Sequence, residues 1–236
     1  MQATAEISPC GRDDNSTSFL LFAKPSKQIY FALTQLDDRS IVSNMKTDTR
    51  EHILACGGRI VHHKGFAATG LQEILRAAGV PKGSFYFYFK SKEEFGLALV
   101  DHYQTLFATH LRPILTDETL PPLQRLARFF LWFRDHFAQE GYIKGCPIGN
   151  LTQELGDINP AFREKLNTAL EGLIRGVAKQ LRQAQERGEL RRELSPDATA
   201  QFIISAWQGA LVRMKAAAGP EPLDNFQTMI FEVLLA

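Results

Sequence analysis

The sequence is poor in cysteine and carries no recognisable metal-binding pattern. Its three cysteines, Cys10, Cys56 and Cys146, are an odd number at unrelated positions, which argues against a disulfide framework and against a zinc site with paired ligands. They are typical of free thiols in a reducing compartment. His62 and His63 are adjacent and so do not share a helix face, and we interpret them as a polar helix end. We therefore expect neither a metal nor a cofactor.

The sequence also lacks long hydrophobic runs and a large net charge. No apolar segment approaches the roughly 20 residues that a membrane-spanning helix requires, and the first residues lack the layout of a secretory signal, so we expect a cytoplasmic protein without a membrane partner. A net charge of +1 means that any nucleic-acid affinity requires local clusters of Lys and Arg. Residues 45–95 contain eight Lys and Arg against five Asp and Glu, whereas residues 96–236 contain fifteen against sixteen. Positive charge is therefore concentrated in the first of these segments, where it can neutralise phosphate groups.

Three segments of different character follow one another along the chain. Residues 1–44 mix polar turn-forming residues with a short apolar stretch and show no sustained periodicity. A second methionine, Met45, stands directly before the first strongly patterned segment. We therefore expect residues 1–44 to be a leader that is disordered or not translated. The remaining residues divide into a small domain at 45–95 and a larger one at 96–236.

The small domain begins with a predicted helix whose apolar residues recur at helical spacing. Thr47 or Asp48 can cap its start, and Gly65 ends it. Gly57 and Gly58 lie inside the helix, where each glycine costs up to about 1 kcal/mol relative to alanine. The pair therefore predicts either a close contact with another helix or local softness.

Two shorter helices follow, joined by a tight turn. Residues 71–78 place their apolar side chains on one face, Gly79 and Val80 form the turn, and Pro81 begins a third helix that ends near Phe89. This arrangement is the sequence form of a helix-turn-helix, whose second helix enters the major groove of DNA. Helical hairpins also occur in purely structural proteins, so a structural helical dimer is an alternative interpretation.

The larger domain alternates amphipathic segments with Pro and Gly breaks, and no segment has the alternation of a strand. A fourth helix begins after Ser91 and reaches about Leu111, with Glu93 and Glu94 in its first turn. The last two helices each carry a wide apolar stripe, too wide to be covered by one neighbour. We expect them to pack on their own domain with one side and on a second subunit with the other. The chain is thus predicted to be an all-α homodimer.

Specific residue combinations within positions 48–100 strengthen the helix-turn-helix interpretation. They are Lys64-Gly65-Phe66, Ala78-Gly79-Val80, Lys82-Gly83, Tyr86 with Tyr88-Phe89, and Ser91-Lys92-Glu93-Glu94. With these motifs the segment resembles the N-terminal domain of TetR-family (TetR/AcrR) transcriptional regulators. Residues 207–211 are similar to the dimerising helix of that family, whereas Phe87 and the glycine pair depart from its usual pattern. The resemblance implies an N-terminal three-helix DNA-binding domain followed by a larger helical domain for ligand binding and dimerisation.

The resemblance and the residue chemistry together predict which side chains contact DNA. Phosphate contacts are expected from Thr69, Lys82, Tyr86, Tyr88 and Lys92. Base edges or thymine methyl groups are expected to meet Ser84, Phe85 and Lys82, and Gly83 allows a close approach of the helix to the DNA backbone. Alternatively, the phenylalanines of this helix belong to the core, and Lys92 belongs to an ordinary solvated surface.

The resemblance also implies a ligand pocket within the larger domain. We expect its lining to include Phe107, Phe129, Phe133, Phe137, Cys146, Leu166, Leu170 and Trp207. An aromatic cluster of this kind can equally be plain core, and both descriptions hold together when a pocket is a gap in the core.

Cys146 is the residue that most limits the kind of effector to be expected. It precedes a helix and lies two residues after Lys144, a setting that favours the thiolate and raises its reactivity toward oxidants and electrophiles. The surrounding segment resembles the NemR-like, electrophile- and redox-responsive subgroup of the family. An inert packed thiol is the alternative.

These observations predict a transcriptional regulator that binds double-stranded DNA, most simply a repressor that a small-molecule or electrophile effector releases from a palindromic operator. An activator of the same fold is one alternative. Another is an enzyme that consumes electrophiles through Cys146, but no His and Asp or Asn arrangement near the thiol supports turnover. We therefore expect the protein not to be an enzyme.

Overall fold

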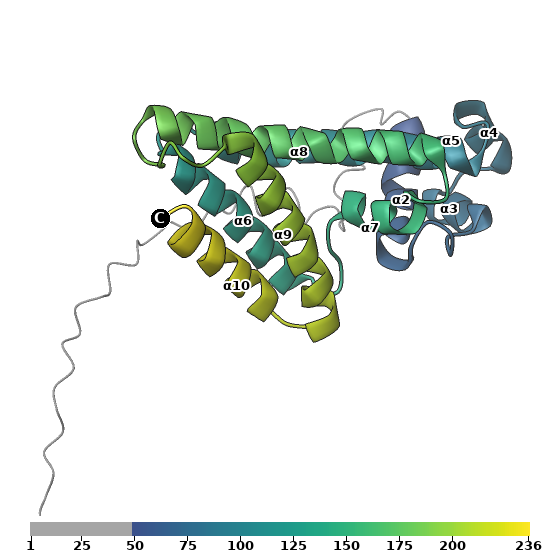
Figure 1. The fold of residues 1–236 in the computed structure, drawn as a ribbon. Coiled ribbons are helices and arrows are strands. Elements are labelled where there is room, and N and C mark those ends of the chain that lie inside the picture. The colour runs from purple at the N-terminus through teal and green to yellow at the C-terminus, as the bar shows by residue number, and fades with distance from the viewer. Residues whose placement is uncertain (1–48) are drawn as a thin grey trace, which may run out of the picture.

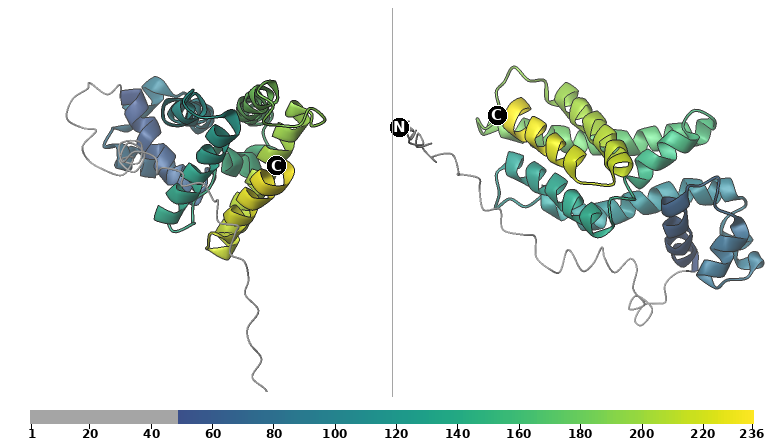
Figure 2. Two further views of the ribbon diagram at one scale, coloured as in Figure 1. Left: turned by 90° about the vertical axis from the view of Figure 1, so that its left-hand side faces the viewer. Right: turned by 90° about the horizontal axis from the view of Figure 1, so that it is seen from below.

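The computed structural model describes residues 49–236, and all the regular secondary structure in this part of the chain is helical, as the sequence predicts. The predicted caps Thr47 and Asp48, and the leader at 1–44, lie outside the described residues. The helices are α2 (Thr49–Lys64), α3 (Leu71–Ala78), α4 (Lys82–Tyr88), α5 (Lys92–Leu115), α6 (Pro122–Gln139), α7 (Pro147–Leu155), α8 (Pro160–Glu186), α9 (Pro196–Ala217), α10 (Glu221–Thr228) and a final π-helical turn, η3 (Met229–Leu234). Helices α2 to α4 gather at one end of the molecule, and α6, α9 and α10 at the other (Figures 1 and 2).

Local capping explains where the helices of the N-terminal end begin and end. Gly79 ends α3 in the left-handed conformation, with φ of 63°, and its N–H donates to the Arg76 carbonyl. The Ser91 hydroxyl caps α5 by accepting from the Glu94 N–H at 3.0 Å, while the Glu94 carboxylate accepts from the N–H of Lys90. The predicted helix-turn-helix and the predicted cap of the fourth helix are therefore confirmed.

Glycines in α2 allow it to pack closely against α5. A β-carbon at Gly57 would lie 2.6 Å from the Phe95 ring and 3.0 Å from Ile74, and one at Gly58 would lie 2.9 Å from Leu99. These distances are too short for any larger side chain without a shift of the neighbours. Of the two explanations that the sequence left open for the glycine pair, the structure shows the close helix contact.

The C-terminal end has an aromatic core enclosed by α6, α8, α9 and α10. The Phe130 ring lies 5.0 Å from the indole of Trp207 and 4.9 Å from the ring of Phe226, both in edge-to-face geometry. All three side chains are buried. Burial of each large side chain contributes about 1.5 to 3 kcal/mol, which makes this cluster a main source of stability for the domain.

Helix α5 belongs to both ends of the molecule. It begins beside α4 and continues to Leu115, one turn beyond the predicted end, because Ile114 is buried in the C-terminal core. Gly96 lies where the two ends meet, since a β-carbon there would come within 2.5 Å of Phe66 and 2.6 Å of Phe162. The predicted domain boundary after residue 95 falls inside this continuous helix, and the division remains a prediction.

Candidate nucleic-acid interface and internal cavity

Helix α4 presents one exposed face and one buried face. Lys82 and Gly83 are exposed at its start, where the Lys82 ammonium lies 5.7 Å from the ring of Tyr86. Tyr86 is 46% exposed and Phe87 is 81% exposed, the largest value for any large hydrophobic residue among those described. Tyr88 is half-buried. The exposed face thus combines a cation, a phenol and an apolar ring, which are groups suited to phosphates and base edges.

Phe85 occupies the opposite face, which corrects the prediction that it meets base edges. It is completely buried, with its ring 5.2 Å from Phe89 and 5.7 Å from Phe95. Phe85 and Phe89 are four residues apart and therefore share the inner face of the helix. Phe87, two residues from each, points outward. The alternative that the phenylalanines of this helix belong to the core therefore holds for Phe85 and Phe89, while Phe87 is the exposed one.

Thr69 is a second correction. Its side chain is completely buried, and its hydroxyl donates to the Gly65 carbonyl at 2.6 Å. The residue closes the loop between α2 and α3, where a buried hydroxyl needs a partner. Thr69 is therefore part of the scaffold and is not available to a phosphate.

Lys92 already has partners within the chain. Its ammonium donates to the Phe66 carbonyl at 2.7 Å and lies 4.6 Å above the Phe66 ring. Burial lowers the pKa of Lys92, and the nearby carboxylate of Glu154 partly opposes that effect. The side chain thus fastens the start of α5 to the loop after α2, and its predicted phosphate contact remains a prediction.

Hydrogen bonds join both ends of α7 to α2 or to the loop that follows α2. At its C-terminal end, the Glu154 carboxylate accepts from the backbone N–H groups of Phe66 at 2.8 Å and Ala67 at 2.5 Å. At its N-terminal end, the His62 imidazole donates from Nε2 to the Gly145 carbonyl at 2.8 Å. The bonds to the Glu154 carboxylate are charge-assisted, and the bond to Gly145 is neutral. Together they hold α7 between α2 and the cavity described below. The role of Glu154 has no signal in the sequence, because its partners lie far away in the chain.

Replacing His62 with glutamine is expected to reduce the pH dependence of stability. Burial lowers the pKa of His62 from 6.5 to about 4, so the folded state favours the neutral ring. As the pH falls below 6.5 the unfolded chain takes up the proton first, and stability present above that pH is progressively lost down to about pH 4. Between pH 7.5 and 4.5 this loss is about 2 to 3 kcal/mol.

Urea unfolding of both proteins at the two pH values measures this effect. Glutamine keeps a donor for the Gly145 carbonyl but has no titrating group, while the carboxylates that also titrate are common to both proteins. The same loss of unfolding free energy in wild type and in His62→Gln would show that His62 is not the titrating group.

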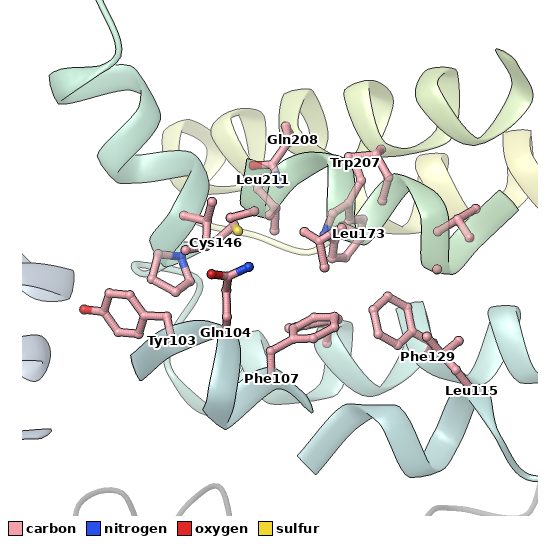
Figure 3. Close-up of a pocket in the computed structure, with 18 of the residues that line it drawn as sticks. Tyr103, Gln104, Phe107, Leu115, Phe129, Cys146, Leu173, Trp207, Gln208 and Leu211 are labelled. Carbon is pink, nitrogen blue, oxygen red and sulfur yellow. The ribbon is translucent and has the colours of Figure 1, made fainter. Parts of the chain in front are cut away.

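A cavity of about 200 Å³ lies between α5, α6, α7, α8 and α9 (Figure 3). Six of the eight predicted pocket residues line it, namely Phe107, Phe129, Phe133, Phe137, Cys146 and Trp207. Two carboxamides that were not predicted also line it, Gln104 on α5 and Gln208 on α9. Isolated glutamines on amphipathic helices carry no sequence pattern that marks them as cavity residues.

Leu166 and Leu170 do not line the cavity, which corrects their predicted place. On α8 the cavity is lined by a stripe that runs from Ala169 to Val177. Leu166 lies nearly one turn before this stripe and is completely buried in the core shared with the N-terminal domain, and Leu170 packs against the same core. Both leucines therefore join α8 to the N-terminal domain.

Cys146 stands at the point where the cavity meets α7. Its thiol is half-buried, lines the cavity and caps α7 by accepting from the Gly149 N–H at 3.4 Å. Lys144, which was expected to support the thiolate, forms an ion pair with Glu140. The backbone N–H of Gly149, in the first turn of α7, is therefore the polar group that contacts the sulfur.

Exposed apolar side chains lie on α9 and η3. Phe202 on α9 is 58% exposed and Val233 on η3 is 56% exposed, and Val212 and Met229 are also exposed. These residues lie on the two helices that the sequence predicts to form the subunit contact.

No helix within residues 49–236 is long and apolar enough to span a membrane.

Comparisons with known proteins agree with this geometry. Residues 53–99 match the family model described as bacterial regulatory proteins, tetR family, and residues 122–230 match the model of the tetracyclin repressor-like C-terminal domain. The transcriptional regulator AcuR of Cereibacter sphaeroides is 41% identical over 75% of this chain and 80% of its own length. The repressor DhaR of Mycobacterium sp. (strain GP1) is 36% identical over 80% of this chain and 94% of its own, and the repressor NemR of Escherichia coli is 35% identical over 75% and 89%.

Solved structures show the same fold. A regulatory protein TetR from Rhodobacter sphaeroides superposes with a TM-score of 0.74 at 39% identity, covering 80% of this chain and 99% of that chain. The reduced form of E. coli NemR superposes with a TM-score of 0.72 at 30% identity, covering 80% of this chain and 98% of that chain.

Proposed function

Because the chain belongs to the TetR family of bacterial regulatory proteins and is thus a DNA-binding transcriptional regulator, we propose that it is a homodimeric repressor released from its operator by an effector that acts in the cavity beside Cys146. The observation that carries this proposal is the placement of α7. Cys146 caps the start of this helix at the cavity, and Glu154, near the end of the helix, holds the loop between α2 and α3. A change at the cavity therefore has a direct structural route to the DNA-reading helix.

DNA is read by the exposed face of α4 in this proposal. Lys82, Tyr86 and Tyr88 contact phosphates, with Gly83 allowing close approach, and Ser84 faces base edges. Phe87 takes the role first assigned to Phe85 and contacts thymine methyl groups, because it is the apolar side chain that points outward.

Dimerisation through α9 and α10 supplies the second reading helix. The exposed apolar residues Phe202, Val212, Met229 and Val233 support this surface as the contact, since burial of such a patch in a twofold dimer removes it from water. Two subunits related by a twofold axis place two copies of α4 in successive major grooves. A palindromic operator with half-sites about one helical turn, ~34 Å, apart matches that geometry.

The operator is released because the effector binds more tightly to the arrangement of the dimer that does not fit the DNA. A ligand in the cavity, or an adduct on Cys146, competes with the Gly149 N–H for the sulfur and displaces the start of α7. The helix moves Glu154 and with it the loop at Phe66, so the spacing of the two reading helices changes. The relatives named as repressors, DhaR and NemR, support repression as the direction of control.

Replacing Lys82 with alanine, or Tyr88 with phenylalanine, is expected to weaken DNA binding at every sequence by about 1 to 3 kcal/mol. Each change removes one phosphate contact, and loss of the Lys82 charge also lowers the salt dependence by about one unit of slope. Phenylalanine is chosen at position 88 because the Tyr88 ring contacts Phe87 and Phe89 within the domain.

Fluorescence anisotropy with a duplex from the region flanking the gene, at several salt concentrations, measures both effects. Lys179 is an exposed lysine on α8, outside the reading surface, so Lys179→Ala is the matched control. Equal losses in Lys82→Ala and Lys179→Ala would contradict the assigned phosphate contact.

A further inference from the structure

Gln208 lines the cavity and carries a polar group that has no hydrogen-bond partner among the described residues. This group is its side-chain nitrogen, which is buried. A buried amide donor without a partner is rare, because the group has lost its hydration and gained nothing in return. A hydrogen bond from the Gln208 amide to a bound acceptor is therefore favourable. The terminal torsion of the side chain rotates easily, so the donor can turn toward such an acceptor.

Gly149 is a common neighbour of this amide and of Cys146. A β-carbon at Gly149 would be 2.1 Å from Oε1 of Gln208 and 3.4 Å from Cβ of Cys146. The carboxamide and Cys146 thus border the same point on α7, and the absence of a side chain at Gly149 leaves room for the amide. Figure 3 shows the Gln104 amide reaching from α5 toward Cys146, which makes this end of the cavity its polar end.

The remaining lining determines what kind of molecule can enter. Aromatic rings of Phe107, Phe129 and Phe133 line the cavity away from the amides, with contacts of 5.2 to 6.3 Å between ring centroids. None of the described lining residues is an aspartate, glutamate, lysine, arginine or histidine. A charged ligand would therefore be buried without a counter-ion, which is strongly unfavourable.

We propose that Gln208 is a specificity-determining residue that selects an uncharged carbonyl compound as the effector. The carbonyl oxygen accepts a hydrogen bond from the Gln208 amide beside Cys146, and the apolar part of the ligand lies among the phenylalanine rings. A cavity of about 200 Å³ limits the ligand to a small molecule. This inference rests on the proposed function of the cavity as the effector site and adds the chemical class of the effector.

Three probes of nearly equal size test the proposal on the purified full chain. Acetophenone has an apolar ring and a carbonyl, α-methylstyrene replaces the carbonyl oxygen with a methylene, and benzoate carries a charge. None of these is expected to alkylate Cys146, so binding is separated from thiol chemistry. Isothermal titration should show acetophenone binding about tenfold more tightly than α-methylstyrene, as one buried hydrogen bond implies, and benzoate binding least.

Three variants test whether Gln208 causes the preference for acetophenone over α-methylstyrene. Gln208→Leu should bind acetophenone and α-methylstyrene equally. Gly149→Ala keeps the glutamine but displaces its amide, so it should give the same result by a different change. Gln201→Leu, an exposed position on the same helix, should discriminate like wild type.

Two results would overturn the inference about the ligand. They are equal affinity of wild type for acetophenone and α-methylstyrene, and discrimination that persists in both Gln208→Leu and Gly149→Ala. The release of operator DNA, measured in parallel by anisotropy, separates this inference from the proposed function. Selective acetophenone binding that leaves the operator complex intact would refute the cavity as the effector site, and the effector role of the carbonyl compound with it.

Discussion

Replacing Phe85 with alanine is expected to lower the free energy of unfolding by about 3 to 5 kcal/mol. The side chain is completely buried against Phe89 and Phe95, so its loss leaves a cavity where α4 packs on α5. DNA binding by Phe85→Ala should fall only as far as the domain loses its fold. Urea unfolding followed by circular dichroism measures the change in stability.

Phe87→Ala is the matched control for this prediction. Phe87 is 81% exposed, so its replacement should change the free energy of unfolding by no more than about 0.5 kcal/mol. Its affinity for the operator should nevertheless fall by about 1 to 3 kcal/mol, since the variant lacks the apolar contact with a base. The opposite outcome, a destabilised Phe87→Ala and a stable Phe85→Ala with weak DNA binding, would mean that the faces of α4 are assigned the wrong way round.

Replacing Cys146 with serine is expected to abolish the release of DNA by an electrophile. N-ethylmaleimide should dissociate the wild-type complex as the Cys146 sulfur forms a bond to an alkene carbon and the neighbouring carbon takes up a proton. The adduct fills the cavity and removes the sulfur from the Gly149 N–H, which displaces the start of α7. Serine is a good N-cap and keeps this helix start, but it is a far weaker nucleophile.

Anisotropy of a labelled operator during titration with N-ethylmaleimide measures the release, and mass spectrometry counts the adducts. Cys56→Ala is the control, because Cys56 is buried in the core of the N-terminal domain and away from the cavity. Wild-type release by Cys146→Ser would refute the thiol as the sensor. Consumption of many equivalents of electrophile per chain would favour the enzyme alternative.

The helix-turn-helix could be predicted from the sequence because its determinants are local. A left-handed glycine at Gly79, a Ser91 cap with Glu94 three residues later, and apolar residues at helical spacing each act within a few positions of the chain. The glycine pair at Gly57 also indicated a close contact, although not the partner helix. Six of the cavity residues could also be predicted, because the family resemblance implies a pocket and aromatic residues gather on α6.

The remaining features depend on contacts that are distant in sequence. Helix α4 has only seven residues, too few for a periodicity that tells which of Phe85 and Phe87 faces inward. Leu166 and its neighbours on α8 repeat the same spacing along the whole helix, so the sequence does not reveal where the cavity ends and the shared core begins. Glu154 and Gln208 acquire their roles only from partners on other helices.

Chemical protection of the major groove tests the central claim that α4 lies there, twice over, in a twofold dimer. Methylation of guanine N7 reports access to the major groove directly, since this atom faces that groove alone. The operator bound by the full chain should show two protected patches whose centres lie about 10 base pairs apart, or a multiple of that distance, and Phe87→Ala should weaken both equally. Unchanged methylation of the bound operator, or a single protected patch, would contradict the claim.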